Sequence, residues 1–432
     1  MQQLPRRRFL KTLASVSALS PLCLPEIGSA GSMSGRVVLA GGGFAGATCA
    51  RYLRRIDPSV AVTLVDPQDG YHACPMSNWV IGGLRQSGSL AVNRDGLAAA
   101  GVNVVRDSAI TIDGNARKVT LAAGSTLEYD RLVVAPGIEF KWGSPEGYDQ
   151  AAAEVMPHAW QTGPQTTLLQ HQLEAMEDGG VVVIAVPAAP FRCPPGPYER
   201  ASLIAHYLKN NKPKSKIIIL DANDKFSKQA LFKEAWDALY PGMIEWVPVT
   251  EDGAVKRVDP KAMALYTELG EHKVSVANVI PAQGAGRLAA DAGLTDESGW
   301  CPIDAKTFES RNMPGVHVIG DACIANPMPK SASAANSQAK NCALAIRALL
   351  RGEEPGEPSL HNTCYSLVAP DYAISINGIY RLANGKIVAV EGSGGVSPSG
   401  ATPEFRAREA EYNQGWYESI IADSFGQANR TS

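Results

Sequence analysis

A cysteine stands in the middle of a proline-rich segment at residues 187–197. The segment reads Pro-Ala-Ala-Pro-Phe-Arg-Cys-Pro-Pro-Gly-Pro and follows the strand-like run Val181–Val186. A loop that binds nucleotide phosphates needs glycines for close approach and free backbone N–H donors at a helix start. Five prolines remove such donors, and Cys193 adds a thiol. The sequence therefore predicts a thiol site in place of a nicotinamide site, and electrons that do not come from NADH or NADPH.

The number of cysteines limits how they can pair. The chain has eight, and Cys23 lies in a segment that we expect to be removed, which leaves seven. In an oxidising compartment, an odd number means that at least one cysteine is free, joined to another chain or bonded to a group that is not a cysteine. No spacing of Cys and His resembles a zinc site, and no C-x-x-C-H haem motif occurs. The cysteines without an assigned role are Cys49, Cys301, Cys323 and Cys342.

The first thirty residues resemble an export signal. Arg6-Arg7-Arg8-Phe9-Leu10-Lys11 fits the twin-arginine pattern, the apolar run Thr12–Leu24 follows, and Gly28-Ser29-Ala30 is a suitable cleavage site. The alternative is a membrane anchor, but spanning a bilayer takes about twenty apolar residues. We therefore expect a twin-arginine signal peptide over residues 1–30, a periplasmic protein and no integral membrane segment.

The composition is that of a globular chain, with 45% hydrophobic and 19% charged residues. A length of 432 residues allows two or three domains. A net charge of −3 does not fit a surface that binds nucleic acid, so no such partner is expected.

Three glycines have the spacing of a dinucleotide-binding turn. Gly41, Gly43 and Gly46 follow the strand-like run Arg36–Ala40, open a helix-like run that we place at 47–56, and precede Asp66 by twenty residues. Glycines of this kind permit a tight turn against a pyrophosphate, and the acid accepts a hydrogen bond from a ribose hydroxyl group. A glycine-rich turn without a ligand is the alternative.

Further turns follow two other expected strands. Pro136-Gly137 comes directly after the strand-like run Arg131–Ala135, and Gly320-Asp321 ends a strand that begins near residue 313. A helix is expected at Ser331–Arg351, and a Gly/Glu/Pro linker at 352–358. Beyond the linker, strands are expected at 372–380 and 386–390, and a polar helix after Pro403.

The predicted fold class is α/β, with two Rossmann-like dinucleotide-binding domains and a C-terminal α+β domain. We expect the first domain to be discontinuous and the second to have lost its nucleotide site. The expected bounds are 35–150 and 271–351 for the first domain, 151–270 for the second and 359–432 for the C-terminal domain.

These features together resemble the flavoproteins with two dinucleotide-binding domains in the disulfide-reductase superfamily. Three stretches are more specific: they are similar to the flavoprotein subunit of flavocytochrome c sulfide dehydrogenase and to its relative in thiosulfate oxidation. The stretches are Tyr71–Asn78 (YHACPMSN), Pro190–Arg200 (PFRCPPGPYER) and Cys364–Pro370 (CYSLVAP).

The resemblance implies FAD as cofactor, joined by a thioether to Cys74. A thioether also accounts for one of the seven cysteines. A buried apolar cysteine is the alternative for Cys74. Asp321 is expected to hold the ribityl or phosphate end of FAD, and the Gly41–Gly46 turn is expected to meet the pyrophosphate. Further contacts with the cofactor are expected from Asp66, Pro136, Gly137 and Gly320.

The resemblance further implies that Cys193 and Cys364 form a redox-active disulfide. Arg192 and the expected helix at 198–211 would favour a thiolate at Cys193. Hydrosulfide would attack this disulfide, making one sulfur a persulfide and releasing the other as thiolate. A structural disulfide is the alternative.

Two further residues are candidates for the site. Glu199 could move protons near the flavin, or only stabilise a helix start. Trp416 resembles an aromatic residue that reaches the active site in the family, or it only packs in the tail.

The resulting hypothesis is an exported enzyme that oxidises sulfide to sulfur or polysulfide and reduces a separate c-type cytochrome subunit. One rival is a sulfide:quinone oxidoreductase, which needs an apolar or basic surface near the C-terminus. The other is a non-catalytic flavoprotein of a thiosulfate-oxidising complex.

Overall fold

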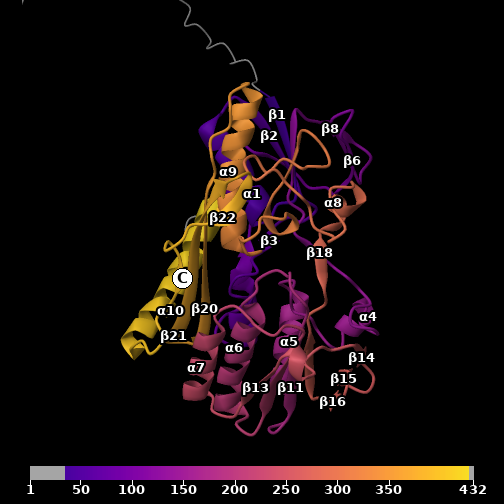
Figure 1. The fold of residues 1–432 in the computed structure, drawn as a ribbon. Coiled ribbons are helices and arrows are strands. Elements are labelled where there is room, and N and C mark those ends of the chain that lie inside the picture. The colour runs from indigo at the N-terminus through magenta and orange to yellow at the C-terminus, as the bar shows by residue number, and fades with distance from the viewer. Residues whose placement is uncertain (1–34, 428–432) are drawn as a thin grey trace, which may run out of the picture. The chain divides into compact units, whose positions relative to one another are not determined.

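The computed structural model describes residues 35–427 (Figure 1). The expected signal peptide, residues 1–30, lies outside the described residues and stays a prediction. In the described part of the chain, no helix combines the length and the apolar character needed to cross a membrane.

Five parallel strands form the first sheet, in the order β19-β9-β1-β2-β5. Apart from their first residues, β1 and β9 are buried on both faces, which explains why they read as continuous apolar runs, whereas β5 at the sheet edge is exposed or half-buried. The strands expected at 36–40 and 131–135 are confirmed, and the strand expected to begin near residue 313 begins at Val316. The bounds are β1 Gly35–Ala40, β2 Val60–Val65, β5 Asn103–Val105, β9 Arg131–Val134 and β19 Val316–Val318.

Two helices, α1 (Phe44–Ile56) and α9 (Ala332–Leu350), pack against each other over this first sheet. α1 begins three residues before the expected start at residue 47, which places Gly46 inside its first turn. A Cβ added to Gly46 would lie 1.9 Å from the carbonyl oxygen of Gly41. Only glycine therefore allows the helix to approach the strand this closely.

The second sheet has four parallel strands in the order β13-β12-β11-β17. Its bounds are β11 Val181–Val186, β12 Lys216–Asp221, β13 Ile244–Val247 and β17 Val276–Val279, and the nearby helices are α5 Pro164–Ala175, α6 Gly196–Asn211 and α7 Gln229–Leu239. The boundary that we expected at 270/271 is wrong in one respect. β17 lies beyond it, yet β17 pairs with β11 and so belongs to the second sheet.

The C-terminal portion consists of a small antiparallel sheet and a long helix. The bounds are β20 Ser359–Ala369, β21 Tyr372–Ala383, β22 Lys386–Ala389, β23 Gly395–Val396 and α10 Pro403–Phe425. β21, β22 and the helix after residue 403 confirm the expectation. β20 was not expected, although it carries Cys364 and pairs with β21 along most of its length.

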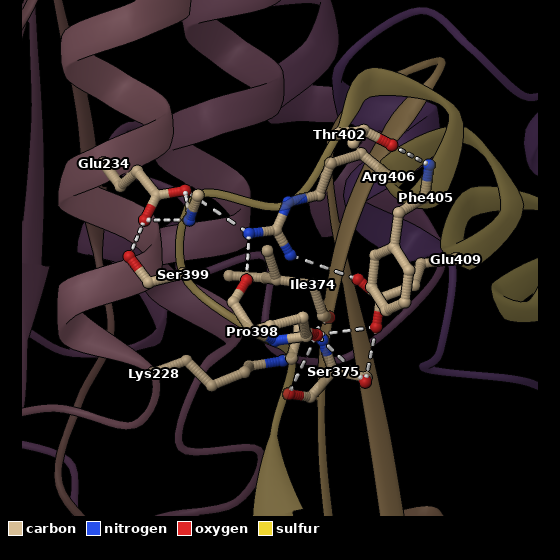
Figure 2. A network of polar contacts seen from close by, with 12 residues as sticks. Lys228, Glu234, Ile374, Ser375, Pro398, Ser399, Thr402, Phe405, Arg406 and Glu409 are labelled. Carbon is tan, nitrogen blue, oxygen red and sulfur yellow. Dashed lines mark hydrogen bonds and ion pairs between the residues drawn. The ribbon is translucent and has the colours of Figure 1, made fainter.

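A buried arginine anchors the start of α10 (Figure 2). The Arg406 side chain is 1% exposed and forms ion pairs with Glu234 of α7 and Glu409 of α10, both at 3.3 Å. It also donates to the carbonyl oxygen of Pro398 at 2.7 Å. Glu409 accepts a hydrogen bond from Ser375 of β21 at 2.7 Å. These contacts fix α10 against both β21 and α7.

The other end of α10 is fixed against α1. Ser424 and Thr48 share a hydrogen bond of 2.9 Å, and Arg51 donates to the carbonyl oxygen of Asp423 at 2.6 Å. The ring of Phe425 stacks on Tyr71, with 5.4 Å between the ring centroids. The C-terminal helix therefore closes on the element that follows the glycine turn.

Short elements complete the described chain. The strands are β3 Tyr71–His72, β4 Ala91–Val92, β6 Ala109–Asp113, β7 Lys118–Leu121, β8 Thr126–Glu128, β10 Ile138–Phe140, β14 Arg257–Asp259, β15 Ala264–Tyr266, β16 Glu271–Lys273 and β18 Gln283–Ala285. The helices are α2 Ser77–Ile81, α3 Asp95–Ala99, α4 Gln150–Ala153 and α8 Arg287–Asp291, and three 3-10 turns lie at 87–90, 249–251 and 320–322.

Candidate active site

A cavity of about 1230 Å³ opens at the carboxyl ends of the first sheet, where α/β folds bind ligands. Its walls also include the cysteine-bearing loop before α6, the strand β20 and the helix α10. Of the thirteen predicted site residues, Gly46 alone does not line it. The residues that do are Gly41, Gly43, Asp66, Cys74, Pro136, Gly137, Cys193, Glu199, Gly320, Asp321, Cys364 and Trp416.

The glycine turn is held by a salt bridge that the sequence did not reveal. Asp66 accepts a hydrogen bond from the backbone N–H of Gly42 at 2.7 Å and forms an ion pair with Arg94 at 2.8 Å. Arg94 in turn donates to the carbonyl oxygen of Gly42 at 2.7 Å. Gly41 has φ of +105°, and a Cβ there would lie 2.3 Å from the carbonyl oxygen of Ala135. Position 41 therefore accepts only glycine, and these contacts preorganise the turn.

Asp321 offers an unused acceptor to the cavity. Its Oδ1 is buried and has no hydrogen-bond partner among the described residues. Burial raises the pKa of this carboxyl group, while the charges of Arg192 and Lys330 lower it. A buried polar atom without a partner is costly, so this oxygen is suited to a ligand hydroxyl group. Together with the glycine turn at a helix start, it fits a dinucleotide such as FAD.

Cys74 lies on the cavity wall in the segment between β3 and α2, where it is half-buried. Its sulfur is 3.9 Å from the hydroxyl oxygen of Tyr71. The Tyr71 ring packs edge-on against Phe44 and stacks on Phe425. These aromatic contacts fix the strand from which the Cys74 loop departs, so the thiol is held at the cavity.

Cys193 lies in a tight loop whose backbone is held from outside. Its φ is +56°, and its N–H donates to the carbonyl oxygen of Lys330 at 2.8 Å. A Cβ on Gly196 would lie 2.7 Å from Trp160 and 3.1 Å from the Cys193 sulfur. Glycine at position 196 therefore leaves room for the thiol beside the indole ring.

At the free Cys193 thiol, Arg192 acts in the expected direction, but burial opposes a thiolate more strongly. Burial raises the pKa of this thiol well above the ordinary value, and the charges of Cys364 and Glu199 raise it further. Arg192 and Lys228 lower it without compensating. Desolvation of a buried anion outweighs the effect of nearby cations here.

Cys364 lies on β20 and reaches the same cavity. Burial raises the pKa of its thiol, the charge of Lys228 lowers it, and Glu199 raises it. Because each of the two cysteines is electrostatically coupled to Glu199 and Lys228, they share one environment. The structure records both as free thiols, and their pairing stays a prediction.

Glu199 connects the cysteine loop to β20. One carboxylate oxygen accepts a hydrogen bond from the N–H of Leu367, and the other accepts one from Asn78, both at 2.9 Å. Burial raises the pKa of Glu199, although these bonds and the charges of Lys228 and Arg200 lower it. A buried carboxyl group with a raised pKa is suited to proton transfer near neutral pH.

Trp416 lines the cavity from α10, and its ring centroid lies 6.5 Å from that of Tyr365. Asn413, one turn earlier, also lines it, and its buried Nδ2 has no partner in the described part of the chain. Asn413 is not among the predicted site residues.

The loop after β11 has few backbone donors left for a phosphate. The N–H groups of Ala189, Arg192, Cys193 and Gly196 all donate within the protein. Asp221 lies at the end of β12, where an acid would accept a hydrogen bond from a ribose hydroxyl group. It is fully buried and accepts a hydrogen bond from the hydroxyl group of Tyr198 at 2.6 Å. The ring of Phe226 stacks on Tyr198 at 3.7 Å. An aromatic cluster thus covers the acid that a nicotinamide nucleotide would need.

Within residues 35–427, no three His, Cys, Asp or Glu side chains are grouped so that they could hold a metal ion.

Three family models match the chain. Residues 35–183 match the pyridine nucleotide-disulphide oxidoreductases. Residues 166–281 match the central part of the flavoprotein chain of sulfide dehydrogenase (flavocytochrome c). Residues 356–425 match the flavin-binding part of flavocytochrome c sulphide dehydrogenase.

Similar proteins carry related names. Over 45 residues the chain is 58% identical to the flavoprotein chain of sulfide dehydrogenase (flavocytochrome c) from Chlorobaculum thiosulfatiphilum, which covers 10% of this chain and 94% of that sequence. It is 22% identical over 315 residues to the mitochondrial sulfide:quinone oxidoreductase of Dictyostelium discoideum, and the match covers 70% of this chain and 68% of that sequence. The solved sulfide:quinone oxidoreductase from Aquifex aeolicus shares the fold, with a TM-score of 0.70 and 18% identity. The match covers 91% of this chain and 92% of that one.

Proposed function

Because this chain belongs to the family of flavoprotein chains of flavocytochrome c sulfide dehydrogenase, we propose that it oxidises sulfide at Cys193 and Cys364, with FAD as cofactor and a separate c-type cytochrome as acceptor. The family consists of oxidoreductases. One observation carries the proposal: Cys74, Cys193 and Cys364 come from three distant segments and line one cavity that also holds the glycine turn.

The cavity residues fit FAD. The Gly41–Gly43 turn and the start of α1 would meet the pyrophosphate, and Asp66 would meet the adenosine ribose. The unpartnered Oδ1 of Asp321 would accept a hydroxyl group of the ribityl chain. Cys74 would hold the ring through a thioether. When bound, FAD supplies the two-electron acceptor for the reaction.

The two cysteines would carry the chemistry as a disulfide. Hydrosulfide attacks one sulfur, a new sulfur–sulfur bond forms, and the Cys193–Cys364 bond breaks. The attacked cysteine becomes a persulfide that keeps the proton of hydrosulfide, and the other leaves with the electron pair as a thiolate. The net product of this step is one persulfide and one thiolate.

Two residues support this step without exchanging sulfur. Glu199, held by β20 and α2, would take up or release a proton beside the cysteines. Trp416 would cover the cavity from α10 and exclude water from the sulfur site.

The cytochrome and the compartment complete the proposal. The chain has no C-x-x-C-H motif, so a haem acceptor would belong to another chain. The twin-arginine pattern over residues 1–30 supports a periplasmic location.

Sulfide:quinone oxidation is the second candidate, because proteins of that name match 70% of the chain in sequence and 91% in fold. The three cavity cysteines do not distinguish an enzyme that reduces a cytochrome from one that reduces a quinone. The specific matches at residues 166–281 and 356–425 favour cytochrome reduction.

The holoenzyme is expected to reduce cytochrome c with sulfide and not to reduce a soluble quinone analogue. Anaerobic mixing with sulfide should bleach the flavin absorbance, and added cytochrome c should restore it. Turnover with the quinone analogue alone would support the second candidate instead. No turnover with either acceptor would point to a non-catalytic component of a thiosulfate-oxidising complex.

NADH and NADPH are expected not to reduce the bound flavin, because the loop after β11 has few free backbone donors and Asp221 is buried under aromatic rings. Anaerobic mixing with excess NADH, followed at the flavin absorbance, measures this. Dithionite is the positive control. Bleaching by NADH within seconds would contradict our interpretation of the loop.

A further inference from the structure

Lys228 is a buried lysine directly behind the cysteine pair. It is 7% exposed and precedes α7 with φ of +61°, an uncommon conformation for a residue other than glycine. Its ammonium group donates to Ser366 Oγ at 2.8 Å and to the carbonyl oxygens of Cys364 at 3.2 Å and Ile374 at 3.4 Å. Figure 2 shows it beside Ile374. All three acceptors are neutral.

No carboxylate in the described part of the chain forms an ion pair with Lys228. The nearby carboxylates, Glu199 and Glu409, are both held elsewhere. Glu199 is bound by a backbone N–H of β20 and an asparagine of α2. Glu409 is bound by two serine hydroxyls and an arginine. The ammonium group is therefore hydrogen-bonded to neutral acceptors and is not held in an ion pair within the described part of the chain.

The ammonium group lies on the side of β20 from which the Cys364 sulfur projects. Side chains two residues apart on a strand share a face and are about 6.6 Å apart. Ser366 and Cys364 are such a pair, and the ammonium contacts the first by its hydroxyl and the second by its carbonyl oxygen. An anion on Cys364 would thus form within reach of a positive charge that is not held in an ion pair.

We propose that Lys228 is a positioning residue that holds negative charge on the Cys364 sulfur in preference to the Cys193 sulfur. The inference deepens the proposed function and rests on it. Hydrosulfide then attacks Cys193, whose sulfur becomes the persulfide. The disulfide bond breaks, and its electron pair stays on Cys364 as the thiolate beside Lys228.

The charges around the pair agree with this direction. Burial lowers the pKa of Lys228, while Cys364, Glu199, Cys193 and Glu409 raise it in that order. Burial raises the pKa of both thiols, and Lys228 is the largest influence that opposes it at Cys364. At Cys193, Lys228 acts more weakly than its other charged neighbours. In thiol–disulfide exchange, the sulfur with the lower thiol pKa leaves faster.

The first test uses the unmodified holoenzyme after reduction with dithiothreitol. Iodoacetamide is added over a range of pH, and the alkylated peptides that carry Cys364 and Cys193 are quantified by mass spectrometry. The alkylation midpoint of Cys364 should lie at lower pH than that of Cys193. The opposite order would overturn the proposal, and this measurement needs no variant.

The second test compares three variants in the same assay. Lys228→Gln keeps hydrogen-bond donors but removes the charge, Lys228→Arg keeps the charge, and Lys233→Gln removes the charge of an exposed lysine on α7. Loss of a cation at this range should raise the Cys364 midpoint by about one unit, which is about tenfold slower alkylation below both midpoints. Lys228→Arg and Lys233→Gln should stay near the unmodified midpoint.

The outcomes separate this inference from the proposed function. An unchanged Cys364 midpoint in Lys228→Gln, or an equal shift at Cys193, would overturn the role of Lys228 even if sulfide oxidation is normal. Conversely, absence of sulfide turnover would refute the proposed function but leave the alkylation midpoints intact, since alkylation requires no sulfide.

Discussion

Replacing Cys364 by serine is expected to abolish reduction of the flavin by sulfide. Serine offers no exchangeable sulfur, so no disulfide can form with Cys193 and hydrosulfide has no disulfide bond to attack. The observed rate in anaerobic stopped-flow mixing should fall by about a thousandfold or more, the scale seen when a nucleophile that acts within a unit is removed. Cys193→Ser should lose as much, because the two sulfurs act together.

Two controls separate lost chemistry from lost structure. Dithionite should still reduce the flavin in both variants, since it does not require the cysteines. Cys342→Ser is the matched control. This thiol is fully buried on α9 and does not line the cavity, so sulfide should still reduce the flavin in this variant. Sulfide oxidation near the original rate in Cys364→Ser would show that the mechanism is wrong.

The second large effect is expected at Cys74. If the thioether forms, acid-precipitated protein should keep all of its flavin, and Cys74→Ser should release it completely on denaturation. Flavin fluorescence of a denaturing gel measures this, with the unmodified chain beside the variant. The native variant should still bind FAD, because the glycine turn and Asp321 remain.

A matched control again comes from a cysteine elsewhere in the chain. Cys49→Ser changes a buried thiol of α1 that is not on the cavity wall, so its flavin should stay attached to the denatured chain. Release of free flavin from the fully matured, unmodified protein would rule out a covalent bond at Cys74.

The parts of the fold that could be predicted are those in which burial dictates the pattern. β1 and β11 are buried on both faces along most of their length, so their apolar runs were visible without tertiary information. The glycine spacing located the turn between β1 and α1. It could not show that Gly46 serves helix packing, because that depends on a distance of 1.9 Å from an added Cβ to another backbone atom.

β20 escaped prediction because its buried positions include polar residues. Asn362 is 3% exposed and bonded to Ser331, and Ser366 is fully buried against Lys228. Hydrogen bonds from distant segments make burial of these side chains acceptable, and no local pattern announces such bonds. The hypothesis about Cys364 therefore came from resemblance and not from periodicity.

The electrostatics of the site were the least predictable part. Neighbouring cations suggested a thiolate at Cys193, yet burial outweighs them. Lys228 and Arg94 gave no signal, since a lysine or arginine is normally exposed and only the fold shows that these two are enclosed. The signal peptide, the disulfide and the thioether all stay predictions.

The closure of α10 onto α1 has a consequence for the order of biosynthesis. A ribosome delivers Gly41 and Cys74 long before β20 and α10, yet Cys364 and Trp416 form the opposite wall of the same cavity. The last contacts, between residues 422–425 and α1, form only when nearly the whole chain has emerged. Until then the cofactor would face open solvent on one side. If the thioether forms at Cys74, its formation in an enclosed site would therefore be a late maturation event, and a prematurely terminated chain would lack the wall that shelters the flavin.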